Sequence, residues 1–298
     1  MEKEELNSYK KAGEITLEAQ ELAKKTLKEG ANLFDFAEKI EEAIKKKGGF
    51  PAFPINLSVN EVAAHYTPSF ESKDELPDGA VIKVDIGVHV DGFICDSART
   101  IDFSGKYKTM VSASEEALEE AVKLAKEGMV LGKIGSKIES TIKGKGFKVI
   151  ENLSGHGVKQ NDAHTYPTIP NISNNDSKKL EDGMVIAIEP FATNGAGFVR
   201  EGNQAEIFQL IEKKGVRTKE ARQIMDFVDK NYKTLPFAER WIQRELKMPE
   251  FARKVGLREL MQKKCITAFP LLHEKEGSIV TQAETTLVLH DGKVTRLI

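Results

Sequence analysis

The sequence predicts an α+β fold with two similar halves, on the basis of an internal repeat and of the helical patterns that precede each copy. Residues 76–85 align without a gap on residues 180–189, and five of the ten positions are identical. Each copy consists of a turn and an apolar strand that ends in a carboxylate, Asp85 or Glu189. A chance similarity of two short strands is the alternative. Because the two acids fall in register, we expect pseudo-symmetric halves that aim both carboxylates at a shared centre.

The first half opens with two helical patterns, each closed by a glycine, and Asn32 can cap the second. A segment with two prolines follows. Two strand patterns are then joined through Asp91-Gly92, a dipeptide that favours a two-residue hairpin turn. The predicted elements are helices 3–29 and 33–47 and strands 81–90 and 93–101.

The second half begins with a possible capping box, Ser112 with Glu115, ahead of apolar residues at helical spacing that continue to Gly128. A second helix stops at Gly146. Strand character returns near the C-terminus, where a turn at residues 290–293 leads into the last strand. The predicted elements are a helix from 112, a helix over about 134–145, and strands 279–289 and 294–298.

The pattern changes after Phe208, where three helices are predicted in succession. Thr218 can cap the first, and proline occupies an early position in the other two. We predict a helical insertion subdomain over residues 209–265, within a catalytic domain formed by residues 1–208 and 266–298. The three helices are 218–232, 236–246 and 249–264.

Composition excludes several classes of protein. The chain of 298 residues has a net charge of −2, which offers no broad cationic surface to nucleic acid or to an anionic membrane. It has no run of about eighteen apolar residues and no apolar signal segment near its N-terminus. Only Cys95 and Cys265 are available, too few for a disulfide framework. We therefore expect a cytoplasmic protein that binds neither membranes nor specific nucleic acid.

The predicted hairpin brings two acids together. If Asp91 and Gly92 are the turn residues, Asp85 lies opposite Ala98, and Asp96 is two residues from Ala98 on the same face. Such diagonal neighbours have Cα atoms about 7–8 Å apart. That separation suits two carboxylates that share a metal ion. A hairpin with an exposed polar face is the alternative.

A second acid strand and a histidine favour the metal site. Glu189 ends a near-continuous apolar run, which is typical of a strand buried on both faces. An unpaired carboxylate there would cost several kcal/mol in lost hydration, so a cation should meet it. His156 lies between two glycines and can supply a neutral imidazole, although an ordinary loop histidine is the alternative. An oxygen-rich set of acids with one histidine favours Mn²⁺, Fe²⁺, Co²⁺ or Zn²⁺.

The order of these residues resembles a known family. Val-Asp-Ile-Gly-Val surrounds Asp85, Cys-Asp-Ser-Ala-Arg-Thr surrounds Asp96, and His156, Glu189 and Glu284 follow in that order. This pattern resembles the pita-bread metallopeptidases over essentially the whole chain.

Within that family the chain resembles the type 2 methionine aminopeptidases. The segments 52–56 and 60–68 are similar to their substrate-side loop, and the long helical stretch before Glu284 is similar to their insertion. Only two helices and a loop precede the first acid strand. The resemblance is therefore to the short, archaeal-like form without an N-terminal extension.

The resemblance implies a pita-bread fold and a centre with two divalent metal ions, Co, Mn, Fe, Zn or Ni. It implies that Glu189 is the general base for a metal-activated water. His65 and His164 resemble the family histidines that touch the substrate, and Phe53 and Phe191 resemble walls of the methionine pocket. Taken alone, the histidines would be loop residues and the phenylalanines plain core. The implied metal ligands are Asp85, Asp96, His156, Glu189 and Glu284.

The implied activity is removal of the N-terminal methionine from peptides and nascent proteins, with a small second residue favoured. The resemblance also implies a monomer that associates transiently with the ribosome. Two rival functions remain, an Xaa-Pro peptidase on the same site and an inactive pita-bread protein that binds partners. The chain departs from the family at Ala283 and Thr285, where an aromatic and a histidine are common, and at Phe269, where relatives can carry tyrosine. These departures affect packing and pocket shape, since Glu284 itself is present.

Overall fold

The computed structural model describes residues 1–298, and it has the α+β composition that the sequence predicts. The helices are α1 (Lys3–Thr26), α2 (Leu33–Lys46), α3 (Lys108–Leu124), α4 (Leu131–Gly144), α5 (Lys219–Asn231), α6 (Glu239–Leu246) and α7 (Glu250–Gln262). The strands are β1 (Phe50–Pro51), β2 (Asn56–Val59), β3 (Val62–Ala64), β4 (Val81–Val90), β5 (Phe93–Asp102), β6 (Lys148–Val149), β7 (Ser154–Lys159), β8 (Asp162–Pro170), β9 (Val185–Ile188), β10 (Phe191–Thr193), β11 (Arg200–Glu201), β12 (Ile207–Leu210), β13 (Phe237–Ala238), β14 (Ile266–Phe269), β15 (Leu272–His273), β16 (Val280–Gln282), β17 (Thr285–His290) and β18 (Lys293–Arg296). None of the helices has both the length and the apolar composition needed to cross a bilayer.

The first half is a sheet in the order β1-β4-β2, with β5 paired to β4. Its hairpin has the predicted register, because Asp85 pairs with Ala98 and the turn lies at Asp91 and Gly92. Ile82, Val84, Ile86 and Val88 of β4 pack in one core cluster with the buried faces of α1 and α2. Burial of that face fixes the register, since a slip by one residue would point the Asp85 side chain toward α1 and α2.

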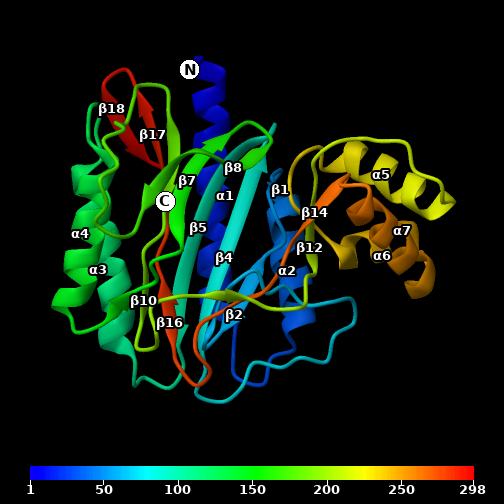
Figure 1. Cartoon of the computed structure of the whole chain (residues 1–298), viewed down its shortest axis with the longest axis horizontal. Helices are drawn as coiled ribbons and strands as arrows, with labels where there is room; N and C mark the ends of the chain where they lie inside the picture. Colours follow the sequence, from blue (N-terminus) through cyan, green and yellow to red (C-terminus); the bar gives the residue numbers. More distant parts are fainter.

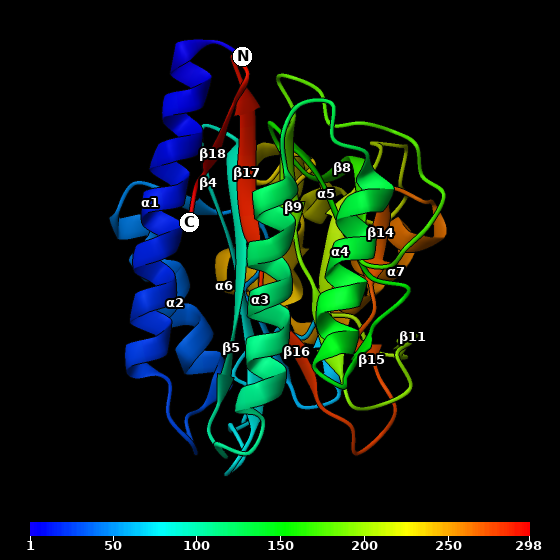
Figure 2. The same cartoon turned by 90° about the vertical axis from the view of Figure 1, so that its left-hand side faces the viewer.

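The second half is a five-stranded sheet in the order β18-β17-β9-β7-β8. The apolar faces of α3 and α4 pack with β9 and β17 in a separate core cluster. Figure 2 shows the α1–α2 pair and the α3–α4 pair side by side in front of the strands. The predicted arrangement of a helix pair with an acid strand in each half is confirmed.

The two halves meet where β5 runs beside β17. The backbone N–H of Asp96 donates to Thr286 Oγ1 at 2.7 Å, and the N–H of Glu284 donates to the carbonyl of Ala98 at 3.0 Å. The hydroxyl of Ser97 donates to the carbonyl of Glu284 at 3.1 Å. These bonds place Asp96 and Glu284, which come from opposite halves of the chain, next to each other.

Helices α5, α6 and α7 stand to one side of the two halves (Figure 1). They pack with a small sheet in the order β13-β12-β14 around a core cluster of their own. Thr218 caps α5 as predicted, by accepting a hydrogen bond from the N–H of Ala221. The division of the chain into a catalytic domain and an insertion subdomain at residues 209–265 stays a prediction.

The predicted boundaries are wrong in several places. Helix α3 begins at Lys108 and contains Ser112, so the capping box does not exist. The chain enters α3 through a different carboxylate, because Asp102 accepts the N–H of Tyr107 at 2.7 Å. The expected strand 279–289 is interrupted at residues 283–284, and α6 starts only at Glu239, because residues 237–238 pair as β13.

Candidate active site

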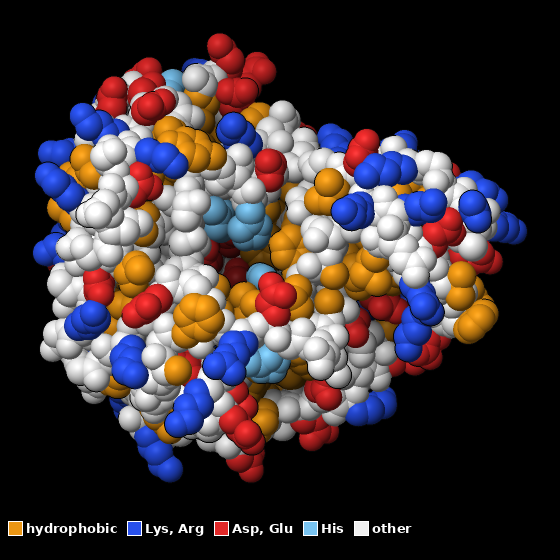
Figure 3. Space-filling view, viewed as in Figure 1, with side chains coloured by type: hydrophobic (Ala, Val, Ile, Leu, Met, Phe, Trp, Pro, Cys, Tyr) orange, Lys and Arg blue, Asp and Glu red, His pale blue; other side chains and the backbone are white.

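The five predicted metal ligands come together in one cavity of about 200 Å³. Asp85 lies on β4, Asp96 on β5 and His156 on β7, while Glu189 follows β9 and Glu284 precedes β17. Both halves of the fold therefore contribute, as the repeat predicted. Figure 3 shows a hollow at the centre of this face, with histidine side chains around it and acidic side chains in its floor.

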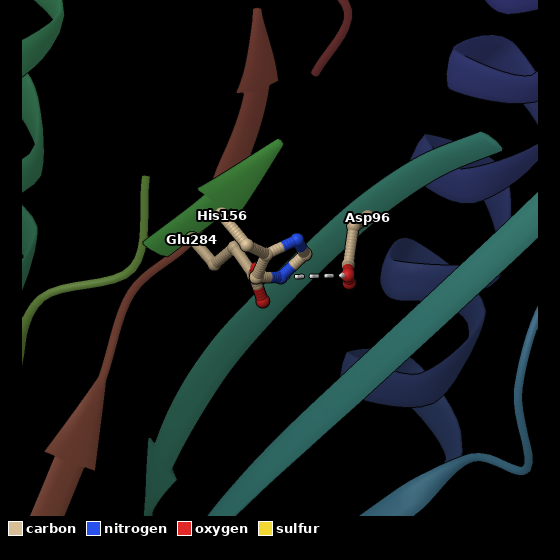
Figure 4. Close-up of side chains that lie close together, drawn as sticks. All are labelled: Asp96, His156 and Glu284. Carbon is tan, nitrogen blue, oxygen red and sulfur yellow. Dashed lines mark ion pairs between the residues drawn. The ribbon is translucent and has the colours of Figure 1, made fainter. Parts of the chain in front are cut away.

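His156 is the residue around which the acids gather. Its Nε2 lies 3.7 Å from Asp96 Oδ2 and 3.5 Å from Glu189 Oε1. Asp96, His156 and Glu284 each offer one ligand atom, and these three atoms lie within 4.8 Å of one another. Figure 4 shows the three side chains converging, His156 from β7, Asp96 from β5 and Glu284 from the segment between β16 and β17. This spacing matches a group of atoms that can share a metal ion.

The carboxylates sit in an environment that opposes their ionisation. Burial raises the pKa of Asp85 from 3.8 to about 7. Burial and then repulsion from neighbouring carboxylates raise the pKa values of Asp96, Glu189 and Glu284 well above their ordinary range. Burial also lowers the pKa of His156 to about 4, so its imidazole is neutral at pH 7. Because His156 is neutral, it supplies no positive charge to compensate the four acids.

Two carboxylate oxygens are buried without any hydrogen-bond partner, Asp85 Oδ1 and Asp96 Oδ1. The residues that line the cavity include no lysine and no arginine. Buried carboxylates in proteins are normally paired or coordinate metal. An oxygen-rich donor set with one neutral imidazole suits divalent ions of the first transition row. The residues present therefore fit divalent metal ions.

The two predicted substrate-side histidines lie at the same cavity. His164 is on β8, and its ring centroid is 4.2 Å from that of His156. His65 follows β3, and its Nδ1 is 3.1 Å from the carbonyl oxygen of Pro270. Burial lowers the pKa of His65 below its ordinary 6.5. The ring of Phe269 packs edge-on against His65 with centroids 5.5 Å apart. Both histidines therefore line the cavity that holds the acids.

Phe53 and Phe191 also line the cavity, and both are buried. A Cβ atom on Gly87 would lie 2.2 Å from Phe53 Cε1, so the ring fits only because β4 has glycine at this point. Of the departures from the family, Phe269 faces the cavity, whereas Ala283 packs in the core of the second half and Thr285 donates its hydroxyl to the carbonyl of Ile298. Pocket shape is thus changed at Phe269 alone among these three.

Sequence reasoning missed several lining residues, of which Gln282 is the most closely connected to the acids. Its Nε2 lies 3.4 Å from Glu189 Oε2 and 3.5 Å from Glu284 Oε2. The signal was available, because residues two apart on an extended segment share a face. The other missed residues are Asn56, Ala64, Asn152, Leu153, Ser154, Ile207, Pro236 and Leu272.

Comparison with known proteins gives the family. The profile of metallopeptidase family M24 matches residues 7–231. The methionine aminopeptidase of Methanocaldococcus jannaschii is 40% identical over 293 residues, which cover 97% of this chain and 98% of that protein. A thermophilic Arx1 superposes with a TM-score of 0.87 at 19% identity, over 100% of this chain and 91% of the other.

The methionine aminopeptidase of Rickettsia prowazekii superposes with a TM-score of 0.72 at 17% identity, over 100% of this chain and 98% of the other. At such identities the structural matches carry the fold alone, which is the pita-bread fold. The profile covers most of the chain, and the relative from Methanocaldococcus jannaschii is similar over nearly the full length of both proteins. The chain belongs to metallopeptidase family M24.

Proposed function

We propose that this protein removes the N-terminal methionine from peptides and nascent proteins. The observation that carries the proposal is a single cavity that joins four acids, two of them buried, and three histidines to an apolar wall. The relative from Methanocaldococcus jannaschii, 40% identical over nearly the whole chain, bears the name methionine aminopeptidase. The acids supply a hydrolytic centre, and the wall supplies a place for an unbranched apolar side chain.

Two divalent metal ions would be held by Asp85, Asp96, His156, Glu189 and Glu284. When bound, such ions polarise a carbonyl and make a water molecule nucleophilic near neutral pH. Two divalent cations also balance the four carboxylates in formal charge. The candidate ions are Co, Mn, Fe, Zn and Ni, and elemental analysis of the purified protein distinguishes them.

The protein's own groups divide the remaining work. Glu189 accepts a proton from the attacking water and returns it to the leaving amine. His164 donates a hydrogen bond to the oxyanion that forms at the substrate carbonyl. His65 donates from Nδ1 to the carbonyl of Pro270, so its neutral ring accepts a hydrogen bond at Nε2 from the scissile amide of the substrate. Gln282 donates to the oxygens of Glu189 and Glu284 and so restricts the rotation of both carboxylates.

The shape of the cavity favours a methionine followed by a small residue. Phe53 and Phe191 bury a linear thioether side chain between aromatic faces, where sulfur packs favourably. Ile207, Pro236 and Leu272 line the same cavity, and we assign them to the part that receives the second residue. A branched second side chain would meet these residues, whereas alanine would not.

The proposal is tested by methionine release from synthetic tripeptides. The purified protein is stripped with a chelator and then assayed with no added ion, or with Mn²⁺, Fe²⁺ or Co²⁺. We expect activity on Met-Ala-Ser only after an ion is restored, and much slower release from Met-Leu-Ser. Acetyl-Met-Ala-Ser is the matched control for the free amine, and Ala-Pro-Ser tests the Xaa-Pro peptidase alternative.

The outcomes separate the candidate functions. Release from Ala-Pro-Ser with none from Met-Ala-Ser would make the protein an Xaa-Pro peptidase. Absence of bound metal and of all peptide hydrolysis would favour a partner-binding protein without activity. Full activity in a verified metal-free sample would refute the hydrolytic scheme.

Metal binding is expected to raise thermal stability more at pH 7.5 than at pH 5. The folded-state pKa of Asp85 is raised from 3.8 to about 7 by burial. In the metal-free protein this group therefore stabilises the fold fully below its unfolded pKa, and that contribution is lost as the pH rises toward 7. A bound cation offsets the charge above pH 7, and protons compete with it below.

The measurement is Tm with and without a saturating divalent ion at the two pH values. Asp85→Asn is the matched control, since it has no proton to lose at this position. The metal-free variant should show less loss of Tm between pH 5 and pH 7.5 than the metal-free wild type. An equal increase in Tm on adding metal at both pH values would contradict the expectation.

A further inference from the structure

Arg240 is a fully buried arginine of the insertion, at the start of α6, and its side chain reaches into the first half of the fold. Its Nη2 donates to Glu41 of α2, and its Nε lies 3.3 Å from Glu38 Oε1 of the same helix. The guanidinium group is thus anchored on one side by two carboxylates.

The remaining nitrogen of Arg240 points to a different segment. Its Nη1 donates to the hydroxyl of Thr67 and to the carbonyl of Pro68, the latter at 3.3 Å. Thr67 is 1% exposed and lies two residues after His65. The same guanidinium group therefore holds the short segment that carries the substrate-side histidine.

His65 needs such support because its backbone is unfavourable. Its φ angle is +68°, in the left-handed region that residues other than glycine rarely adopt. Strand β3 ends at Ala64, so no ladder of strand hydrogen bonds fixes His65 itself. Its ring is held from the other side by the carbonyl of Pro270, directly after β14. A strained conformation persists only where its surroundings determine it.

We propose that Arg240 is a positioning residue, which acts through Thr67 and Pro68 to hold the His65 imidazole at the mouth of the cavity. The insertion then has a role in the reaction, because α6 and the segment after β14 fix the histidine from two directions. The proposal rests on the proposed function, in which His65 contacts the substrate.

Thr67→Val is the direct test. Valine has nearly the shape of threonine, and it removes one hydrogen bond while Arg240 keeps Glu41, Glu38 and the carbonyl of Pro68. We expect kcat for Met-Ala-Ser to fall roughly tenfold, because small displacements of a positioned group reduce turnover strongly. KM and bound metal should change little. Thr141→Val, which removes a threonine hydrogen bond on α4 far from the cavity, is the matched control and should retain wild-type turnover.

A double-mutant cycle with His65→Ala separates positioning from general destabilisation. If Thr67 acts through His65, adding Thr67→Val to His65→Ala should cause no further loss of kcat. Equal tenfold losses in the two backgrounds would overturn the proposal, since Thr67 would then act independently of His65.

A second readout does not depend on activity. Long-range ¹H–¹⁵N spectra of the histidine rings should show the His65 resonances displaced in Thr67→Val, with those of His290, near the β17–β18 turn, unchanged. Unchanged His65 resonances would overturn the positioning role. A wild-type protein that releases no methionine, together with displaced His65 resonances, would instead refute the proposed function and leave the structural link intact.

Discussion

Glu189→Gln is expected to reduce methionine release by about 10²–10⁴-fold, the loss typical of a missing acid–base group. The substitution keeps the size of the side chain while it removes both the proton acceptor and one anionic oxygen donor. Glu189 lies 3.5 Å from His156 Nε2 and 3.4 Å from Gln282 Nε2, so the amide can occupy the same space. The fold should therefore survive.

The measurement combines turnover with metal content. Glutamine also weakens the donor set, so the variant is assayed over a range of added Mn²⁺ or Co²⁺ up to saturation. A loss that excess metal does not restore belongs to the missing proton acceptor, whereas a loss that it does restore belongs to binding. Glu127→Gln, an exposed carboxylate in the turn between α3 and α4, is the matched control and should keep wild-type turnover. Near wild-type turnover of Glu189→Gln would remove Glu189 from the mechanism.

The hairpin that carries Asp85 and Asp96 could be predicted from the sequence in detail. Its Asp91-Gly92 turn fixes the loop length, and the apolar residues on the other face of β4 fix which side chains face the helices. These two local signals determine the register on their own. The observed pairing of Asp85 with Ala98 follows directly.

The strands that carry the histidines could not be predicted in the same way. Ser154-Gly-His-Gly has little intrinsic strand preference, yet it forms β7. A Cβ on Gly155 would lie 2.3 Å from the carbonyl oxygen of Ala187, and one on Gly157 would lie 2.2 Å from that of Tyr166. The strand exists because glycine lets two neighbouring backbones approach, that of Tyr166 on β8, the next strand of the chain, and that of Ala187 on β9. Tertiary pairing therefore decides the structure here.

The surroundings of His65 depend still more on distant residues. Its ring partner, the carbonyl of Pro270, is 205 residues away in the sequence. Arg240, which holds the same segment through Thr67, belongs to a predicted insertion with no sequence link to the acids. Periodicity and turn chemistry describe only neighbours along the chain, so they did not indicate a role for His65. The resemblance to a family was the only signal that did.

Glu41→Gln is expected to destabilise the protein by roughly 3–5 kcal/mol, the usual cost of removing one partner from a buried ion pair. Glu41 is 1% exposed, and it accepts hydrogen bonds from Arg240, from the indole of Trp241 at 2.7 Å and from the N–H of Ile55 at 3.3 Å. With glutamine at position 41, Glu38 would be the one remaining anionic partner of Arg240. The NH₂ group of the glutamine would also face one of these hydrogen-bond donors.

Urea unfolding provides the measurement, because Trp241 is the single tryptophan and reports on this interface directly. Tryptophan fluorescence and far-UV circular dichroism should both shift to lower urea in Glu41→Gln, and fluorescence should change first if the insertion separates before the two halves unfold. Glu42→Gln, an exposed neighbour paired only with Lys46, is the matched control and should unfold as the wild type does.

The double replacement Glu41→Met with Arg240→Met should recover part of the lost stability, since it removes the buried charge that Glu41→Gln leaves poorly paired. The N–H groups of Trp241 and Ile55 still lose their acceptor, so recovery is incomplete. The double variant should not recover turnover, because methionine cannot donate to Thr67 and Pro68. This one variant would then regain part of its stability without regaining turnover. Stability would depend on charge compensation, and turnover would depend on the position of His65. An unfolding midpoint for Glu41→Gln equal to that of the wild type would show that the pair contributes nothing to the fold.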